Sequence, residues 1–215
     1  MQKALAGPSF LVRQLRFFML IRIGSNGFWQ PRALPTRSLR ETARLFNQIN
    51  SQTIIEIGSG IHGRLAGDNI LTWARRTRAN RIIAVDLDET RIREVKEATS
   101  QYPNVEAIIA EGVRYLADFS STIDLLYLDF WTPDPEGALP GVGRVEAYRN
   151  AFAAARDKLN RRSLILIDDT DHVHPWKHTH IVPDARKEGF VVGFVGRQTL
   201  LTRNLGEEHE GAPSI

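Results

Sequence analysis

The chain has 215 residues, no cysteine and a formal net charge of +3. This length is typical of a single domain with a sizeable core, and so small a charge gives no reason to expect a nucleic-acid partner. Without cysteine the protein has no disulfide framework, thiol nucleophile or thiolate metal site, which fits a reducing, cytoplasmic location.

Residues 1–37 are a basic leader. Residues 1–50 hold eight basic residues and one acidic residue, whereas the rest of the chain holds 20 basic and 24 acidic residues. The apolar segment 9–23 is expected to be a helix, too short to cross a bilayer and without the cleavage site of a signal peptide. Two roles stay open for it: packing on the domain or on a second copy, as a homodimer contact, or lying on an anionic membrane. Residues 26–36 are expected to be a linker.

Residues 38–203 are expected to form the folded domain, followed by a flexible tail at 204–215. Its first helix is predicted to begin with a capping box, in which Ser38 is the cap and Glu41 reaches back. Further helices are predicted at 68–78, 88–100, 144–159 and 184–188. Strands are predicted at 53–57, 81–85, 105–110, 123–130, 163–167, 190–194 and 198–201. This alternation predicts an α/β, Rossmann-like fold with a seven-stranded, mostly parallel sheet, helices on both faces and a terminal antiparallel hairpin.

A glycine-rich turn follows the first predicted strand. Gly58, Gly60 and Gly63 have the spacing G-x-G-x-x-G, and the next strand ends in Asp86, 23 residues after the last glycine. Such a turn gives a ligand access to the backbone, and a carboxylate at that distance can accept the hydroxyls of a ribose. We therefore expect a nucleoside cofactor, although a tight turn without a ligand would also need these glycines.

The two motifs EIGSGIHG and IIAVDLDETRI resemble the class I S-adenosylmethionine-dependent methyltransferases. The resemblance implies that Glu56 supports the methionine end of the cofactor and that Asp86 holds the ribose. It also places the adenine near Glu111–Val113, although the usual acidic pattern of the family is missing there. The cofactor-binding residues expected on this basis are Glu56, Gly58, Ser59, Gly60, Asp86, Leu87, Glu111, Gly112, Val113 and Asp129.

Three carboxylates stand at the ends of the fourth and fifth predicted strands. Asp129 ends the fourth, and Asp168 and Asp169 end the fifth. If these strands are neighbours, the three acids converge, and carboxylate oxygens suit Mg²⁺, which can orient and acidify a substrate hydroxyl. The alternative is that Asp129 contacts the cofactor or caps a turn, while the other two cap the following loop.

The runs IDLLYLDFW and LILIDDT resemble the metal-dependent O-methyltransferases of the catechol and macrocin type. This resemblance implies that Asp129, Asp168 and Asp169 are metal ligands and that Asp129 belongs to the catalytic group. The catechol-type enzymes have a lysine base shortly after the acid of strand four. Here Trp131 is followed by Thr132, so this base is absent.

The segment DHVHPWKHTH, residues 171–180, follows the acidic pair. His172 or His174 is expected to replace the missing base, since imidazole suits proton transfer near neutral pH. Lys177 would serve only with a lowered pKa. A transition-metal site that also uses His178 and His180 and a solvated loop with incidental histidines both stay open.

Together these features predict an S-adenosylmethionine-dependent methyltransferase that methylates a hydroxyl of a small molecule with the help of a divalent cation, Mg²⁺. One alternative is an NAD(P)-dependent oxidoreductase with the same glycine turn. Another is a non-catalytic binding protein that docks on a membrane through the leader.

Overall fold

The computed structural model describes residues 36–60, 69–138, 142–171 and 176–203. The expected leader helix, the linker, Gly63, His172, His174 and the tail lie outside these residues.

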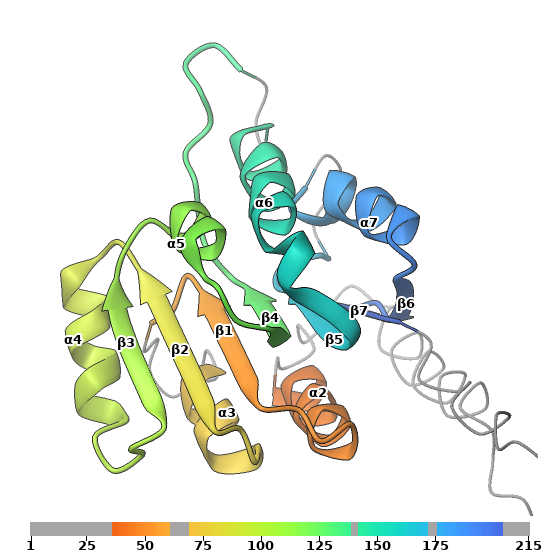
Figure 1. The fold of residues 1–215 in the computed structure, drawn as a ribbon. Helices are drawn as coiled ribbons and strands as arrows, with labels where there is room; N and C mark the ends of the chain where they lie inside the picture. Colours follow the sequence, from red (N-terminus) through yellow and green to blue (C-terminus); the bar gives the residue numbers. More distant parts are fainter. Residues whose placement is uncertain (1–35, 61–68, 139–141, 172–175, 204–215) are drawn as a thin grey trace, which may run out of the picture.

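One seven-stranded sheet forms the middle layer, in the order β3-β2-β1-β4-β5-β7-β6. β1 to β5 are parallel, while β7 is antiparallel to β5 and β6 is antiparallel to β7. The predicted fold class is thereby confirmed (Figure 1). The strands are β1 (Thr53–Ile57), β2 (Arg81–Asp86), β3 (Val105–Ile109), β4 (Ile123–Leu128), β5 (Leu159–Ile167), β6 (Val191–Phe194) and β7 (Thr199–Thr202).

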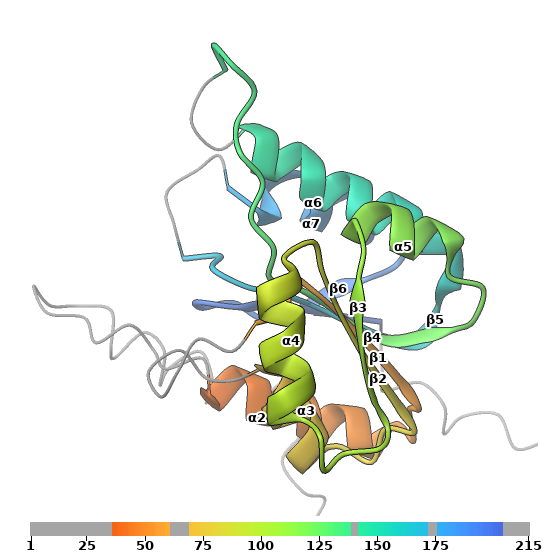
Figure 2. The ribbon, with the colours of Figure 1, turned by 90° about the vertical axis from the view of Figure 1, so that its left-hand side faces the viewer.

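Helices cover both faces of the sheet (Figure 2). One layer contains α2 (Thr36–Gln48), α3 (Asn69–Arg76) and α4 (Glu89–Ala98). The other contains α5 (Gly112–Asp118), α6 (Val142–Ala155) and α7 (His178–Lys187), and the short 3-10 turn η1 (Arg156–Lys158) links α6 to β5.

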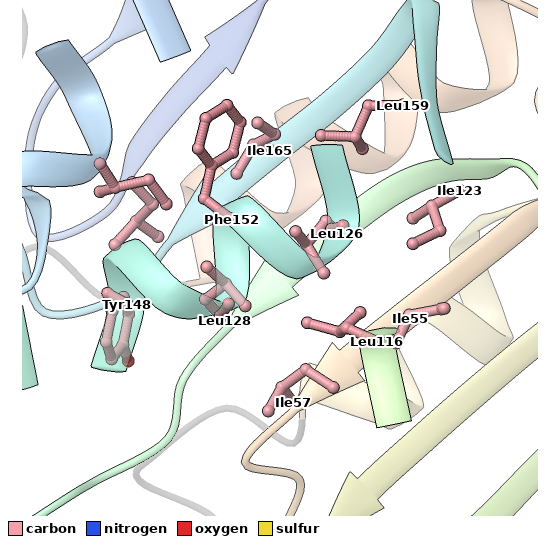
Figure 3. Packing of buried hydrophobic residues seen from close by; sticks show 14 of the residues in the cluster. Ile55, Ile57, Leu116, Ile123, Leu126, Leu128, Tyr148, Phe152, Leu159 and Ile165 are labelled. Carbon is pink, nitrogen blue, oxygen red and sulfur yellow. The ribbon is translucent and has the colours of Figure 1, made fainter. Parts of the chain in front are cut away.

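The strands divide their side chains between two cores because successive residues point to opposite faces. In β1, Ile55 and Ile57 pack toward α5 and α6, whereas Ile54 packs toward α2 and α3. Figure 3 shows the first of these cores, in which Leu116 of α5 and Phe152 of α6 lie over the strand residues. This alternation also decides which side chains reach the site described below.

The structure differs from the prediction at α5, at the start of α7 and around the start of β5, where α6 ends at Ala155 and not at 159. α5 was not predicted. The Glu111 side chain caps this helix by accepting hydrogen bonds from Val113 N and Arg114 N, a local contact that is not apparent from so short a stretch of sequence. α7 begins at His178 and not at 184, because burial of Ile181 and Ala185 one turn apart extends it. β5 begins four residues early, since Leu159 pairs with Ile123.

The predicted capping box is wrong. α2 begins at Thr36, so Ser38 lies inside its first turn. The Ser38 hydroxyl donates to Gln198 Oε1 on the segment before β7, and Glu41 pairs with Arg44. A long-range hydrogen bond therefore uses the side chain that the sequence pattern assigns to a local cap.

Candidate functional site

The candidate site lies at the carboxyl edge of the parallel strands, on the side of α2 and α3. Side chains alternate between the two faces of a strand, so residues two apart share a face. The predicted acids at the strand ends follow, at even spacing, residues of the core between the sheet and helices α2 and α3. Ile54 precedes Glu56 by two residues, and Leu166 precedes Asp168 by two. The other members of this row are Asp86, Ile109, Tyr127 and Asp129.

Gly58 makes a close backbone contact between the glycine turn and the end of β4. Its φ is +86°, and a Cβ at this position would stand 2.4 Å from both Asp129 O and Phe130 Cα. Its N–H donates to Val85 O at 2.9 Å. Glycine is therefore required here by the packing of the protein itself. That requirement exists whether or not a ligand approaches the same backbone.

Glu56 supports the glycine turn through a hydrogen bond from Ser59. It is fully buried, and its carboxyl accepts from the Ser59 hydroxyl at 3.0 Å and from Trp73 Nε1 at 2.8 Å. Burial raises the pKa of Glu56 to about 8, despite the opposing effect of these two hydrogen bonds. The carboxyl is therefore mostly protonated at neutral pH, and its hydrogen bond to Ser59 ties it to the glycine turn.

Asp86 stands one strand away at the end of β2. Asp88 N donates to its Oδ1 at 2.8 Å, and Arg91 Nη1 lies 3.6 Å from its Oδ2. Beside it, Leu87 is 68% exposed and Ile109, the register partner of Asp86 on β3, is 52% exposed. Leu87 and Ile109 thus leave exposed apolar surface beside the carboxyl of Asp86.

Residues Glu111, Gly112 and Val113 form the first turn of α5. Both oxygens of Glu111 accept backbone N–H groups of this turn, as described above. A Cβ on Gly112 would lie 2.3 Å from Ile57 Cγ2. The described contacts of these residues position α5 against β1, so the structure gives each of them a packing role.

The three predicted acids, Asp129, Asp168 and Asp169, do come together, and we call them the acid cluster. Tyr127 OH donates to Asp168 Oδ2 at 2.8 Å and lies 3.4 Å from Asp129 Oδ2. Asn69 Nδ2 donates to the same Asp129 oxygen at 3.1 Å. Burial, and then the charge of Asp168, raise the pKa of Asp129 well above its usual range.

Two cations stand against the acid cluster. Lys177 Nζ lies 3.7 Å from Asp129 Oδ1 and 3.6 Å from Asp169 Oδ2. Arg197 Nη2 lies 3.2 Å from Asp169 Oδ1, and its Nε lies 3.7 Å from Asp168 Oδ1. Asp169 has φ +51°, a conformation uncommon outside glycine, which turns it toward both cations.

The expected metal does not fit this arrangement. Within residues 36–60, 69–138, 142–171 and 176–203, no group of three His, Cys, Asp or Glu side chains is placed to hold a metal ion. Of the predicted histidines, His180 is exposed and pairs with Glu146 of α6 at 3.2 Å. The cations that neutralise the acids are side chains of the protein.

Arg144, near the start of α6, lies between two tryptophan rings at the outer side of the site. Its guanidinium carbon is 5.5 Å from the ring centre of Trp131 and 4.6 Å from that of Trp176. It also pairs with Asp134 at 3.2 Å. The contact joins the loop after β4 to the segment before α7, and it leaves Trp131 66% exposed.

Several residues of this site were not singled out by sequence reasoning as site residues: Asn69, Ile109, Tyr127, Arg197 and Gln198. Lys177 was considered only as a base. A signal existed for Tyr127, which precedes Asp129 by two residues in a strand and must share its face. No signal existed for Arg197, because its contact with the acids depends on the antiparallel pairing of β7 with β5.

No model of a known protein family matches the sequence. Among curated proteins, a polyamine aminopropyltransferase of Methanocaldococcus jannaschii is 26% identical over 119 residues, which cover 53% of this chain and 38% of the relative. One from Desulforudis audaxviator is 34% identical over 56 residues, covering 26% and 20%. The chain thus matches well under half the length of these relatives.

Solved structures resemble the chain over most of its length. A methyltransferase from Geobacter sulfurreducens has a TM-score of 0.55 at 16% identity and covers 93% of this chain and 91% of its own. An SAH-bound methyltransferase from Podospora anserina has 0.53 at 18%, covering 92% and 89%. A putative caffeoyl-CoA O-methyltransferase from Staphylococcus aureus has 0.52 at 15%, covering 91% of each.

Across the described ranges, no helix has the length and apolar character needed to cross a bilayer. The sheet order, the terminal antiparallel pair and these structural likenesses agree on one architecture. The chain has the fold of the class I S-adenosylmethionine-dependent methyltransferases.

Proposed function

We propose that the protein is an S-adenosylmethionine-dependent methyltransferase that methylates a hydroxyl of a small molecule. The observation that carries this proposal is the surface at the end of β2, where Asp86 is flanked by exposed Leu87 and Ile109. A carboxylate offers acceptors to the two hydroxyls of a ribose, and apolar side chains beside it suit the face of a purine. The shared fold supports the same cofactor.

The cofactor, when bound, supplies an electrophilic methyl group, so catalysis depends mainly on the alignment of donor and acceptor. Asp129 connects the glycine turn with the acid cluster. Its backbone packs against Gly58 of the turn, and its side chain belongs to the acid cluster. We propose that the acceptor hydroxyl lies beside Asp129, and that His172 or His174 is the general base.

The first test is calorimetric titration of the full chain with S-adenosylhomocysteine. We expect one site per chain, and roughly tenfold weaker binding in Asp86→Asn, because two ribose hydroxyls lose a charged acceptor. Asp118→Asn is the matched control, since Asp118 is an exposed carboxylate on α5 that forms an ion pair with Arg114. An unchanged affinity in Asp86→Asn would contradict the assigned ribose site.

If the wild-type chain binds NADH and not S-adenosylhomocysteine, the oxidoreductase alternative replaces our proposal. If it binds the cofactor, incubation with S-adenosylmethionine and a series of hydroxylated small molecules, with detection of released S-adenosylhomocysteine, identifies the acceptor class. The membrane-docked alternative requires that deletion of residues 1–25 abolish binding to anionic liposomes.

A second candidate is transfer of an aminopropyl group, the activity in the names of the two curated relatives. One observation favours it: the acid cluster already accommodates an ammonium group, that of Lys177. Mass spectrometry of an amine incubated with the protein and the appropriate adenosyl donor separates the candidates, because the product gains either a methyl or an aminopropyl group.

A further inference from the structure

Every carboxylate oxygen of the acid cluster has a partner from the protein itself. For Asp129, Oδ1 faces Lys177 and Oδ2 accepts from Asn69. For Asp168, Oδ1 accepts from Asp169 N and Oδ2 from Tyr127 OH. For Asp169, the two oxygens face Arg197 and Lys177.

The Lys177 side chain is fixed in this position. Only 5% of it is exposed, and its ammonium lies 5.3 Å from the centre of the Tyr148 ring, over which a cation is attracted. The ring is itself anchored, because Tyr148 OH donates to Phe130 O at 2.9 Å and Phe130 stacks on it. The ammonium therefore lies in a prepared place between Asp129 and Asp169.

We propose that Lys177 and Arg197 are resident counter-cations that exclude divalent metal ions from the acid cluster, so the protein transfers its group without a metal. Mg²⁺ needs oxygen ligands at about 2.0–2.1 Å in near-octahedral geometry. Nζ occupies the space between the two acids that such an ion would bridge, and two positive side chains repel a third cation. The exclusion depends only on the described contacts, whereas metal-free transfer rests on the proposed function.

The test is a titration of the full-length protein with Mn²⁺ and with Mg²⁺, followed by calorimetry. We expect no one-site binding in the wild type. Lys177→Met leaves Asp129 and Asp169 without their shared ammonium. We expect this variant to bind one Mn²⁺ per chain, at least about tenfold more tightly than any residual binding by the wild type. Lys187→Met is the matched control, because Lys187 is an exposed lysine of the same helix that pairs with Asp184.

If Lys177→Met does not fold, as judged by circular dichroism, Arg197→Gln decides the matter, since it frees one oxygen each of Asp168 and Asp169. One Mn²⁺ per wild-type chain, lost in Asp169→Asn, would overturn the proposal. So would the absence of gained binding in both folded variants, because the acids would then not form a latent cation site. Cofactor binding is measured separately, so failure of the methyltransferase proposal leaves this result interpretable.

Discussion

The carboxyl edge of the sheet has two halves that are built differently. In the half at β1 to β3, several side-chain contacts are local: Ser59 bonds Glu56 three residues away, and Asp88 bonds Asp86 two residues away. In the acid cluster, Asn69 reaches Asp129 from 60 residues away. The motifs of the first half are therefore partly readable in the sequence, whereas most of the partners that hold the acids of the second half meet only once the chain has folded.

The two halves also manage buried acid differently. Glu56 has no cationic partner among its described contacts, and its raised pKa leaves it protonated near neutral pH. The acid cluster instead has two cationic partners, Lys177 and Arg197, beside its carboxyl groups. A proton thus neutralises the isolated acid of the first half, whereas side-chain cations stand against the acids of the second.

The largest effect is expected from Gly58→Ala, because Gly58 packs against the backbone of Asp129 and so joins the two halves. The added Cβ would meet Asp129 O at 2.4 Å, so the end of β4 must move, and we expect a loss of about 3 kcal/mol or more in unfolding free energy. Gly189→Ala is the control: its φ is +84°, but no atom lies within 4 Å of its Cβ position, so about 1 kcal/mol is expected. Equal losses in urea unfolding would show that only φ matters.

Glu56→Gln tests the proton-neutralised half. Because the folded pKa, about 8, lies above the unfolded value near 4.5, the folded state binds more protons between these pH values. Stability from this group is therefore fully present below pH 4.5 and is lost as pH rises through 8, by an amount on the order of 5 kcal/mol. We expect the unfolding free energy of the variant, measured with urea, to depend less on pH across this window than that of the wild type. The same pH dependence in both proteins would contradict the raised pKa.

Tyr127→Phe tests the cation-neutralised half. It removes the hydroxyl that donates to Asp168 and accepts from Gln198, so we expect a loss of about 2 kcal/mol in unfolding free energy. Tyr102→Phe removes an exposed hydrogen bond from Arg75 and should cost less than about 0.5 kcal/mol. Similar costs for the two variants would mean that the buried hydroxyl does not organise the acids.

The smallest effect is expected from Ile109→Ala. Ile109 is half exposed, so folding should change little, while S-adenosylhomocysteine should bind about threefold more weakly as apolar contact is lost. Val191→Ala, on the far edge strand β6, removes a similarly exposed side chain and should leave affinity unchanged. An equal effect of both variants in calorimetry would remove Ile109 from the cofactor surface.

The sequence by itself determined the chain order of the seven strands and the place of the glycine turn, and it predicted that Asp129, Asp168 and Asp169 converge if the fourth and fifth strands are neighbours. Periodic burial and turn residues are local signals, and neighbouring parallel strands end at the same edge. α5 shows the limit of such signals, because the hydrogen bonds of Glu111 that cap this helix were not predicted.

Only the tertiary structure decided what neutralises the acids. Lys177 lies eight residues beyond Asp169 in a histidine-rich stretch, and Arg197 lies in a hairpin turn. Neither position in the sequence predicts an ion pair with the acids, because ion pairs between separate elements depend on how α7 and β7 pack against β4 and β5. A pattern of three carboxylates predicts a cation, and the packing of distant elements determines whether that cation is a metal ion or a side chain.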